Sequence, residues 1–515
     1  MGPLIPFVDF ANFLEISDWA PALRRPFLRP FPPMNRDPLV PLIASPFRHY
    51  INGGWETGAT AGVSLNPSDL DDPIGEYVRA DVRQTEGAIE AAHAAFRDWS
   101  FASAQRRADA LDAIGSEMLA RREELARLLA REVGNVLPEA LAEATRAGQL
   151  FKLFAAEALR AFVEPLASAR AGVDIDVTRE PLGVVGVIAP WSAPLAIAAA
   201  KIGAALAHGN CVVYKPAESA PACAAALASI ISRAGLPAGV FNLVMGSGRK
   251  VGARIVAHPL VAAISFAGSS DTGARVLQAA AARQARVQLE MGGKNPFVVL
   301  ADTDLDGAVH AALTGAFSAT GQRSTAAARL IVERAVFAPF VDALQAKLAK
   351  LTVDHALKHG TDVGPVANAA QFERNLDYVR IGEQEGAQLL CGGRPLARAT
   401  RGYFFEPALF IGEPGHRIAR EEIFGPLAVV LRADDYEHAL HLANDSAYGL
   451  CAGICTRSLE RARHFRRHVQ SGLVTINLPT TAVEHHGPGG GRKASAYGAS
   501  DAAFWTAVKT AYVAG

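Results

Sequence analysis

The stretch TGQRSTAAAR, from Thr320 to Arg329, has Ser324 where a nucleophile would stand, between a glycine turn and an apolar run. A serine hydroxyl attacks a carbonyl carbon only when a well-placed base removes its proton. Taken alone, this loop predicts an ester hydrolase that uses Ser324 as its nucleophile. Such an enzyme needs a base, and the sequence offers two carboxylates for that role.

The first carboxylate is Glu290 in LEMGGKNP, at the end of an apolar run and beside glycines that permit close backbone approach. A carboxylate held in an apolar pocket keeps its proton more tightly and can serve as a general base. A strand-end glutamate paired with an arginine is an equally open alternative. The second is Glu422 in EEIFGP, with Phe424 as an apolar wall, although this motif alone is an ordinary turn.

Three further segments could bind a nucleotide. In YKPAES, Lys215 and Glu218 lie three residues apart, so both could meet a ribose and its hydroxyls; the alternative is a solvated strand end. MGSGRKVG and FAGSSDTGARV place Gly248, Gly268 and Ser269 between a strand and a helix, where backbone amides can point at an anion. Neither segment is the GxGxxG fingerprint, and most such segments are plain turns.

Strand-like runs alternate with helical patterns and would position these residues. Residues 84–161 have Ala, Leu and Ile at helical spacing, which predicts helices. Val- and Ile-rich runs separated by helices predict two α/β units with parallel sheets, whose ligands bind at the carboxyl ends of the strands. The expected strands are 181–190, 211–216, 240–246, 261–268 and 286–293 in the first unit, and 295–302, 329–337, 426–434, 451–457 and 472–477 in the second.

Two other segments, AGVDIDVTREP (171–181) and AFWTAVKTAYV (503–513), alternate as strands do but stand outside this order. Projecting strands would leave unpaired edges, which are natural places for two subunits to meet. We therefore expect a homo-oligomer, either a homodimer or a homotetramer.

Composition excludes several classes of function. The 515 residues are 50% hydrophobic and carry a formal net charge of zero, so nothing predicts binding to nucleic acid or to a membrane surface. Five scattered cysteines fit a reducing, cytoplasmic setting, and no apolar run approaches the roughly 20 residues that cross a bilayer. The doublet His485–His486 has no cysteine or further carboxylate at ligand spacing, so we expect no metal site.

The motifs resemble the aldehyde dehydrogenase superfamily from about Tyr50 to Val513. The resemblance is carried, in order, by PWSAPL, KPAES, FAGSSDTG, LEMGGKNP, GQRSTAAAR, EEIFGP, YGLCAGICTR and GGRKASAYG. GLVTINLP, GGRKASAYG and VKTAYV look most like the α-ketoglutarate semialdehyde dehydrogenases. The resemblance implies an α/β fold with two doubly wound α/β domains, a small β oligomerisation element and an aldehyde substrate.

Together, pattern and resemblance predict the domains. They are a Pro-rich N-terminal extension (1–47), an NAD-binding domain (48–161 and 182–291), a catalytic domain (292–480), and oligomerisation strands with a C-terminal arm (162–181 and 481–515). The extension could instead be a partner-docking arm, or it could precede the true start of the protein at Met34.

The resemblance also carries roles to single residues. Lys215 and Glu218 match residues that hold the adenosine ribose, and a carboxylate there accepts a 2′-hydroxyl but repels a 2′-phosphate, so NAD is expected rather than NADP. Glu290 matches the general base. The other positions implied for the cofactor are Trp191, Gly248, Gly268, Ser269, Glu422 and Phe424.

Two positions depart from the family pattern. Ser324 stands where the family has its nucleophilic cysteine, and Ser192 stands where it has an oxyanion-binding asparagine. A thiol has a pKa of about 8.5 and provides thiolate near neutral pH, whereas a serine hydroxyl does not. The sequence therefore leaves three interpretations open: an aldehyde dehydrogenase of impaired activity, an NAD-binding pseudoenzyme or structural subunit, and a Ser324-dependent ester hydrolase.

Overall fold

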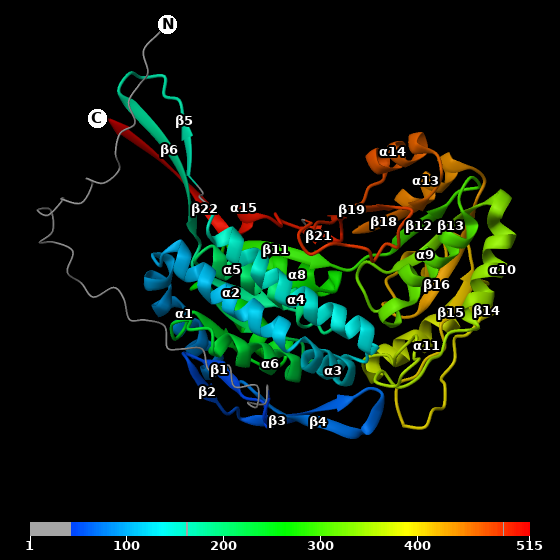
Figure 1. The fold of residues 1–515 in the computed structure, drawn as a ribbon, viewed down its shortest axis with the longest axis horizontal. Helices are drawn as coiled ribbons and strands as arrows, with labels where there is room; N and C mark the ends of the chain where they lie inside the picture. The colour runs from blue at the N-terminus through cyan, green and yellow to red at the C-terminus, as the bar shows by residue number, and fades with distance from the viewer. Residues whose placement is uncertain (1–42, 161–162, 488, 515) are drawn as a thin grey trace, which may run out of the picture. The chain divides into compact units, whose positions relative to one another are not determined.

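The computed structural model describes residues 43–160, 163–487 and 489–514, and two mainly parallel sheets organise them (Figure 1). Residues 1–42 of the extension expected over residues 1–47 lie outside the described residues. Phe47, at its predicted end, already belongs to the folded core, because its side chain is 2% exposed and its amide donates to Glu76 O at 2.7 Å.

The first sheet has eight strands and contains the strands predicted for the first unit. Its spatial order is β2 (Gly54–Glu56), β1 (His49–Ile51), β9 (Phe241–Leu243), β8 (Cys211–Lys215), β7 (Val184–Ile188), β10 (Val261–Gly268), β11 (Arg286–Met291) and β21 (Ala496–Tyr497). The strands from β9 to β11 are parallel, so their carboxyl ends meet at one edge. Val and Ile make up most of β7, and every residue of β8 is buried, as expected for central parallel strands with both faces covered.

The helices predicted over residues 84–161 are present as α1 (Val82–Ser100), α2 (Ala104–Ala120), α3 (Arg122–Val133) and α4 (Leu137–Ala158). Asp81 and Gln84 form a capping box that begins α1, and α3 ends at Gly134, whose φ of 82° requires glycine. The remaining helices of this part are α5 (Ala196–Ala207), α6 (Pro221–Ser232), the π-helical η1 (Gly248–Gly252), α7 (Ala253–Ala257) and α8 (Ser270–Ala281).

The second sheet has seven strands and contains those predicted for the second unit. Its order is β14 (Gln388–Cys391), β15 (Ala408–Ile411), β16 (Leu427–Ala433), β13 (Ala327–Glu333), β12 (Asn295–Val299), β18 (Cys451–Cys455) and β19 (Leu473–Ile476). All neighbours are parallel except β14 and β15. The helices of this part are α9 (Leu305–Phe317), the 3-10 turns η2 (Ser318–Gly321) and η3 (Arg334–Val336), α10 (Phe337–Leu348), α11 (Ala369–Gln384), α12 (Arg417–Arg420), α13 (Tyr436–Asn444) and α14 (Leu459–His468).

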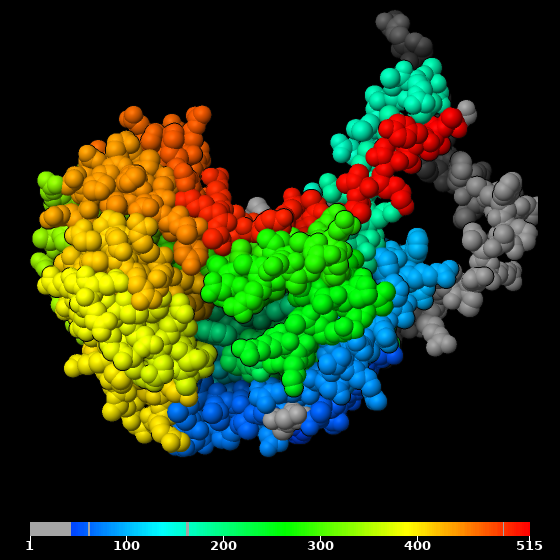
Figure 2. Space-filling model, turned by 180° about the vertical axis from the view of Figure 1, so that it is seen from behind, coloured from blue at the N-terminus to red at the C-terminus, as the bar shows by residue number. Residues whose placement is uncertain are grey.

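The two segments expected to leave unpaired edges pair with each other instead. In a three-stranded sheet, β6 (Val173–Pro181) lies between β5 (Val163–Leu166) and β22 (Thr506–Ala514), and β22 runs antiparallel to it over its whole length. Figure 2 shows β6 and β22 side by side. The expectation of an unpaired edge is therefore wrong for β6, because the matching alternation of β6 and β22 lets each strand satisfy the other's backbone groups. The outer edges of β5 and β22 are the ones left without a strand neighbour among the described residues.

Sequence patterns missed the short peripheral elements. These are the hairpin β3 (Thr60–Asn66) with β4 (Asp69–Arg79), the pair β17 (Tyr448–Gly449) with β20 (Arg492–Lys493), and α15 (Ala502–Trp505). The segment expected to be a C-terminal arm contributes β21 to the first sheet, where it pairs with β11. Among the described residues, no helix is both long and apolar enough to cross a membrane.

Candidate active site

A sharply bent turn presents Ser324. Ala319, Thr320 and Gly321 have φ values of 49°, 56° and 65°, so three consecutive residues are left-handed between α9 and the serine. Such a conformation costs energy for residues other than glycine and persists only where contacts hold it. Asn295 supplies two of these contacts, because its Nδ2 donates to the carbonyl oxygens of Ser324 at 2.7 Å and Ala326 at 2.9 Å.

The Ser324 hydroxyl makes no hydrogen bond to any described residue, and its side chain is half-buried. A serine hydrolase holds its nucleophile against a base that is oriented in turn by a third group. Within the described residues, Ser324 has no such base at hydrogen-bond distance. The geometry therefore does not support the hydrolase interpretation.

Glu290 lies at the end of β11 and is paired with a lysine. The Lys201 Nζ lies 3.2 Å from the Glu290 carboxylate, and the Lys201 side chain is 2% exposed whereas that of Glu290 is 46% exposed. Lys201 also donates to Ser265 Oγ at 3.2 Å, and Ser265 donates to Gln288 Oε1 at 2.7 Å. The apolar pocket considered for Glu290 is thus wrong, because the carboxylate is open to solvent and faces a buried cation.

Ser192 and Trp191 lie in the loop between β7 and α5. Both side chains are half-buried. The Trp191 ring meets the Phe424 ring edge to face, with centroids 5.5 Å apart and planes at 88°. This contact brings the loop after β7 against the loop before β16, so residues from the first sheet and the second sheet share one site.

Two glutamates on α4 hold the loops that carry the two serines. Glu139 Oε1 accepts from Ala319 N at 2.7 Å, in the turn before Ser324. Glu143 Oε1 accepts from Leu195 N at 3.1 Å, just after Ser192. Because the glutamates are four residues apart, they lie on one face of the helix, and α4 therefore fixes one serine loop relative to the other.

Burial of these glutamates is the main influence on their protonation. It raises the pKa of Glu139 above its ordinary value and that of Glu143 to about 7. The nearby positive charge of Arg323 and the backbone amides oppose this shift in both cases. Glu143 therefore titrates near neutral pH.

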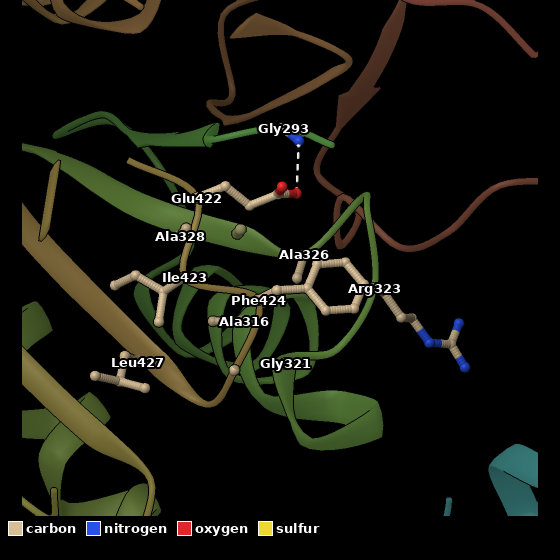
Figure 3. A pocket seen from close by; sticks show the side chains of 12 residues that line it. Gly293, Ala316, Gly321, Arg323, Ala326, Ala328, Glu422, Ile423, Phe424 and Leu427 are labelled. Carbon is tan, nitrogen blue, oxygen red and sulfur yellow. Dashed lines mark hydrogen bonds between the residues drawn. The ribbon is translucent and has the colours of Figure 1, made fainter. Parts of the chain in front are cut away.

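Glu422 and Phe424 form a pocket beside the serine loop (Figure 3). Glu422 Oε1 accepts from Gly293 N at 3.1 Å, and burial raises the pKa of this carboxyl group. A Cβ atom on Gly292 would lie 1.8 Å from Glu422 Oε1, so only glycine leaves room for the carboxylate. Phe424 has a φ of 65°, which is strained for an aromatic residue. The pocket is lined by Gly293, Ala316, Gly321, Arg323, Ala326, Ala327, Ala328, Glu422, Ile423, Phe424, Gly425 and Leu427.

The remaining predicted cofactor residues lie where parallel strands of the first sheet end. Lys215 ends β8 and is buried, its Nζ donates to the Pro216 carbonyl, and burial lowers its pKa to about 8 against the effect of Glu218. Glu218 is exposed, and a Cβ built on Gly248 would meet nothing within 4 Å. Gly268 ends β10, and the exposed Ser269 caps α8.

The structure thus gathers the predicted residues into two groups. Ser324, Ser192, Trp191, Glu422 and Phe424 belong to loops that contact one another, whereas Lys215 with Glu218, Gly248, Gly268 and Ser269 follow β8, β9 and β10. Lys215 is the exception in the second group, because its ammonium is turned into the protein rather than presented at the surface.

The reason given for expecting no metal near His485 and His486 is wrong. Ligand atoms of Glu484, His485 and His486 lie within 4.8 Å of one another, so the adjacent glutamate does provide a third group. Glu484 and His486 are exposed. The absence of a metal stays a prediction.

Several site residues were not identified from the sequence. Lys201 had a usable signal, because it is a single charge within the otherwise apolar helix AIAAAKIGAALA. Asn295, Glu139 and Glu143 had none, since their partners are backbone groups of loops that are 29 to 180 residues away along the chain.

Comparison with known proteins agrees with this geometry. The model of the aldehyde dehydrogenase family matches residues 55–511. The α-ketoglutaric semialdehyde dehydrogenase of Bacillus subtilis (strain 168) is 38% identical over 478 residues, which cover 91% of this chain and 98% of that protein.

Solved structures agree as well. The betaine aldehyde dehydrogenase of Staphylococcus aureus, in complex with NAD+, superposes with a TM-score of 0.88 at 30% identity and covers 91% of this chain and 95% of its own. An Escherichia coli NADP dependent enzyme has a TM-score of 0.88 at 33% identity, with coverages of 91% and 98%. The predicted α/β fold and the resemblance to α-ketoglutarate semialdehyde dehydrogenases are therefore confirmed, and the chain belongs to the aldehyde dehydrogenase family.

Proposed function

We propose that this protein binds NAD and oxidises an aldehyde to a carboxylic acid, at a rate limited by Ser324. One observation carries the proposal: the Trp191–Phe424 contact and the Glu422 pocket lie directly beside the loop that presents Ser324. A cofactor ring held by Glu422 and Phe424 would stand next to the carbon that the serine attacks. The B. subtilis and S. aureus relatives, both named as aldehyde-oxidising enzymes, support this activity.

The residues present fit a dinucleotide. The exposed Glu218 can accept from a ribose hydroxyl, and Gly248 and Ser269 stand at the starts of η1 and α8, near the strand ends where phosphate groups bind. When bound, the nicotinamide accepts the hydride that leaves the substrate carbon. The carboxylate of Glu218 favours NAD, because it would repel the additional phosphate of NADP.

In the proposed reaction, the Ser324 hydroxyl adds across the aldehyde C=O bond, so that its oxygen bonds to the carbon and its proton ends on the former carbonyl oxygen, which later releases it to water. Loss of hydride then leaves an ester on Ser324, which water cleaves to the acid while Glu290 removes a proton from the water. Lys201 orients the Glu290 carboxylate across their 3.2 Å contact. Attack by an alcohol and hydrolysis of an oxygen ester are both slower than the corresponding thiol steps, so turnover is slow.

Ser324 and Ser192 favour a second candidate, an NAD-binding protein without turnover. Both residues stand at positions where the family has reactive or oxyanion-stabilising groups, and neither hydroxyl has a hydrogen-bond partner among the described residues. A lost oxyanion donor alone typically lowers the rate by about 10²–10³. Such a protein would serve as a cofactor-binding or structural subunit.

One experiment separates the two candidates. The wild type and Ser324→Cys are tested for NAD binding by calorimetry and for NADH formation with short aldehydes. Slow turnover by the wild type and faster turnover by the variant support the enzyme. NAD binding with no turnover by either form supports the second candidate, and no NAD binding by either form contradicts both.

We also propose that the protein is a cytoplasmic homodimer or homotetramer. The exposed outer edge of β22, with Val508, Tyr512 and Val513 at least half exposed, supports association through this strand. Light scattering of the wild type and of a Val508→Lys variant tests this. A monomeric wild type would contradict it.

A further inference from the structure

A buried histidine meets the turn that follows β9. His49 belongs to β1, and its side chain is buried on the same face of the strand as Ile51. Its Nδ1 accepts a hydrogen bond from the Met245 amide at 3.2 Å, although the two residues are 196 positions apart in the chain. The Met245 carbonyl oxygen in turn accepts from Ala80 N at 2.9 Å. Both backbone groups of Met245 are therefore held by residues outside this turn.

The turn leads directly to predicted cofactor residues. Residues 245–248 connect β9 to η1, and Gly248 is the first residue of η1. Gly246 has a φ of 147°, which requires glycine, and a Cβ atom there would lie 2.7 Å from a side chain of η1. On another side η1 lies against Lys215, since a Cβ atom on Gly252 would be 3.5 Å from Lys215 Cδ. A displacement of this turn would therefore displace the surroundings of Lys215 as well.

Core packing alone does not explain a histidine at position 49. The Nε2 atom of His49 is buried and has no hydrogen-bond partner among the described residues. Because Nδ1 accepts, the proton of the neutral ring lies on Nε2, and a buried N–H group without an acceptor is unfavourable. A leucine would fill the space without that cost but would leave the Met245 amide unpaired. The acceptor at Nδ1 is thus what distinguishes histidine from an apolar residue here.

His49 remains an acceptor at neutral pH. Burial lowers the pKa of its ring to about 4, and the negative charge of Asp81 opposes this effect only in part. A ring protonated on both nitrogens could not accept from Met245 N. The hydrogen bond is therefore available throughout the neutral pH range.

We propose that His49 is a positioning residue for the cofactor, because it holds the turn 245–248 in the conformation that presents Gly248 to the adenosine half of NAD. The identity of the cofactor rests on the proposed function, whereas the hold on the turn does not. The nicotinamide half is expected at Glu422, on a loop of the second sheet. Loss of the hold should therefore weaken NAD binding but leave the chemical step unchanged once NAD is saturating.

Two amide variants test which nitrogen of His49 matters. In His49→Asn the side-chain oxygen stands near the position of Nδ1, whereas in His49→Gln it stands near that of Nε2. By calorimetry, we expect His49→Asn to bind NAD within about twofold of the wild type, and His49→Gln and His49→Leu to bind about 5- to 20-fold more weakly. In the Ser324→Cys background, KM for NAD should rise in the same order while kcat stays constant. Equal NAD affinity of His49→Asn and His49→Gln would overturn the inference.

His258 provides the matched control. It is also buried, and its Nδ1 accepts from Leu260 N at 3.2 Å, just before β10 begins. This bond lies at the amino end of the strand, whereas ligands of such sheets bind at the carboxyl ends. His258→Gln should therefore lose a comparable hydrogen bond and keep the NAD affinity of the wild type. An equal loss of NAD affinity in His258→Gln and His49→Gln would show an effect of general stability and overturn the inference.

Hydrogen exchange separates failure of this inference from failure of the proposed function. The exchange of a peptide covering residues 244–252 is measured by mass spectrometry without any ligand. We expect faster exchange in His49→Gln and the rate of the wild type in His49→Asn. If no protein binds NAD but exchange follows this order, the hold on the turn stands and the proposed function is removed. Unchanged exchange in His49→Gln would overturn the inference, whether or not NAD binds.

Discussion

The Lys201 ammonium lies 3.2 Å from the Glu290 carboxylate, and the lysine is buried while the glutamate reaches solvent. The pair joins α5, which follows the Ser192 loop, to the end of β11, which precedes the loop that contacts Glu422. The Ser192 loop and the cofactor pocket therefore both adjoin segments that one ion pair joins at the carboxyl edge of the first sheet.

Replacing Glu290 by Gln should destabilise the protein, because Lys201 would keep a buried charge with only Ser265 as a partner. Breaking a fully buried pair costs about 3–5 kcal/mol, and the exposure of Glu290 reduces our expectation to about 1–2 kcal/mol. Chemical denaturation measures this. Asp71→Asn breaks the exposed Asp71–Arg401 pair and is expected to change the free energy of unfolding by less than about 0.5 kcal/mol. Equal losses in both variants would contradict this account of Lys201.

An asparagine amide at position 192 should speed aldehyde oxidation by a protein with a cysteine nucleophile at position 324. In the Ser324→Cys protein, we expect Ser192→Asn to raise kcat by about 10²–10³, because one oxyanion donor contributes that much in comparable sites. Single-turnover NADH formation checks the chemical step. In the wild type, the same Ser192→Asn change should help far less, since attack by the serine remains slow. A large gain in the wild type would mean that Ser324 is not the limiting residue.

Removing Glu139 should loosen the bent turn before Ser324. Glu139→Ala deletes the acceptor of the 2.7 Å hydrogen bond from Ala319 N. A lost hydrogen bond to a charged group costs about 1–3 kcal/mol, so local opening should become roughly 5- to 150-fold more frequent. Hydrogen exchange of the peptide covering residues 316–324, followed by mass spectrometry, measures it.

Glu132 provides the matched control for this experiment. It is also buried and accepts from backbone amides, those of Ala222 and Cys223, both at 2.7 Å. Glu132→Ala should therefore speed exchange near Ala222 and leave residues 316–324 unchanged. Faster exchange of residues 316–324 in both variants would show a global loss of stability instead of a role for Glu139 in this turn.

Stability should depend on pH through Glu143. Burial raises its pKa from an ordinary 4.5 to about 7 in the folded protein. Between these values the folded protein binds more protons than the unfolded chain, so its free energy of unfolding falls as the pH rises and levels off above about 7. We expect the difference in free energy of unfolding between the wild type and Glu143→Gln to change by about 1–3 kcal/mol between these two pH values.

Denaturation at a series of pH values measures the Glu143 effect. Replacement of the exposed Glu123 by Gln serves as the control. The free energy of unfolding of this variant should change with pH in the same way as that of the wild type. If the free energy of unfolding of Glu143→Gln also changes with pH as that of the wild type does, burial does not control the protonation of Glu143.

The sequence by itself determined the two parallel sheets and the loops that hold the site. Val- and Ile-rich runs separated by helical patterns located β8, β10 and β16 within one or two residues, because buried parallel strands need apolar residues on both faces. It also placed Ser324, Glu422 and Phe424 in turns at strand ends, where glycine and small residues interrupt the pattern.

Only the tertiary structure decided which groups face these residues. Lys201 reaches Glu290, Glu139 reaches Ala319, and β22 pairs with β6 across large separations in the chain. Local patterns report propensity and burial, whereas a buried polar group takes whatever partner the packing of distant elements brings to it. For this reason the sequence could name Ser324, but only the packing of α4 against its loop placed Glu139 beside the turn that presents the serine.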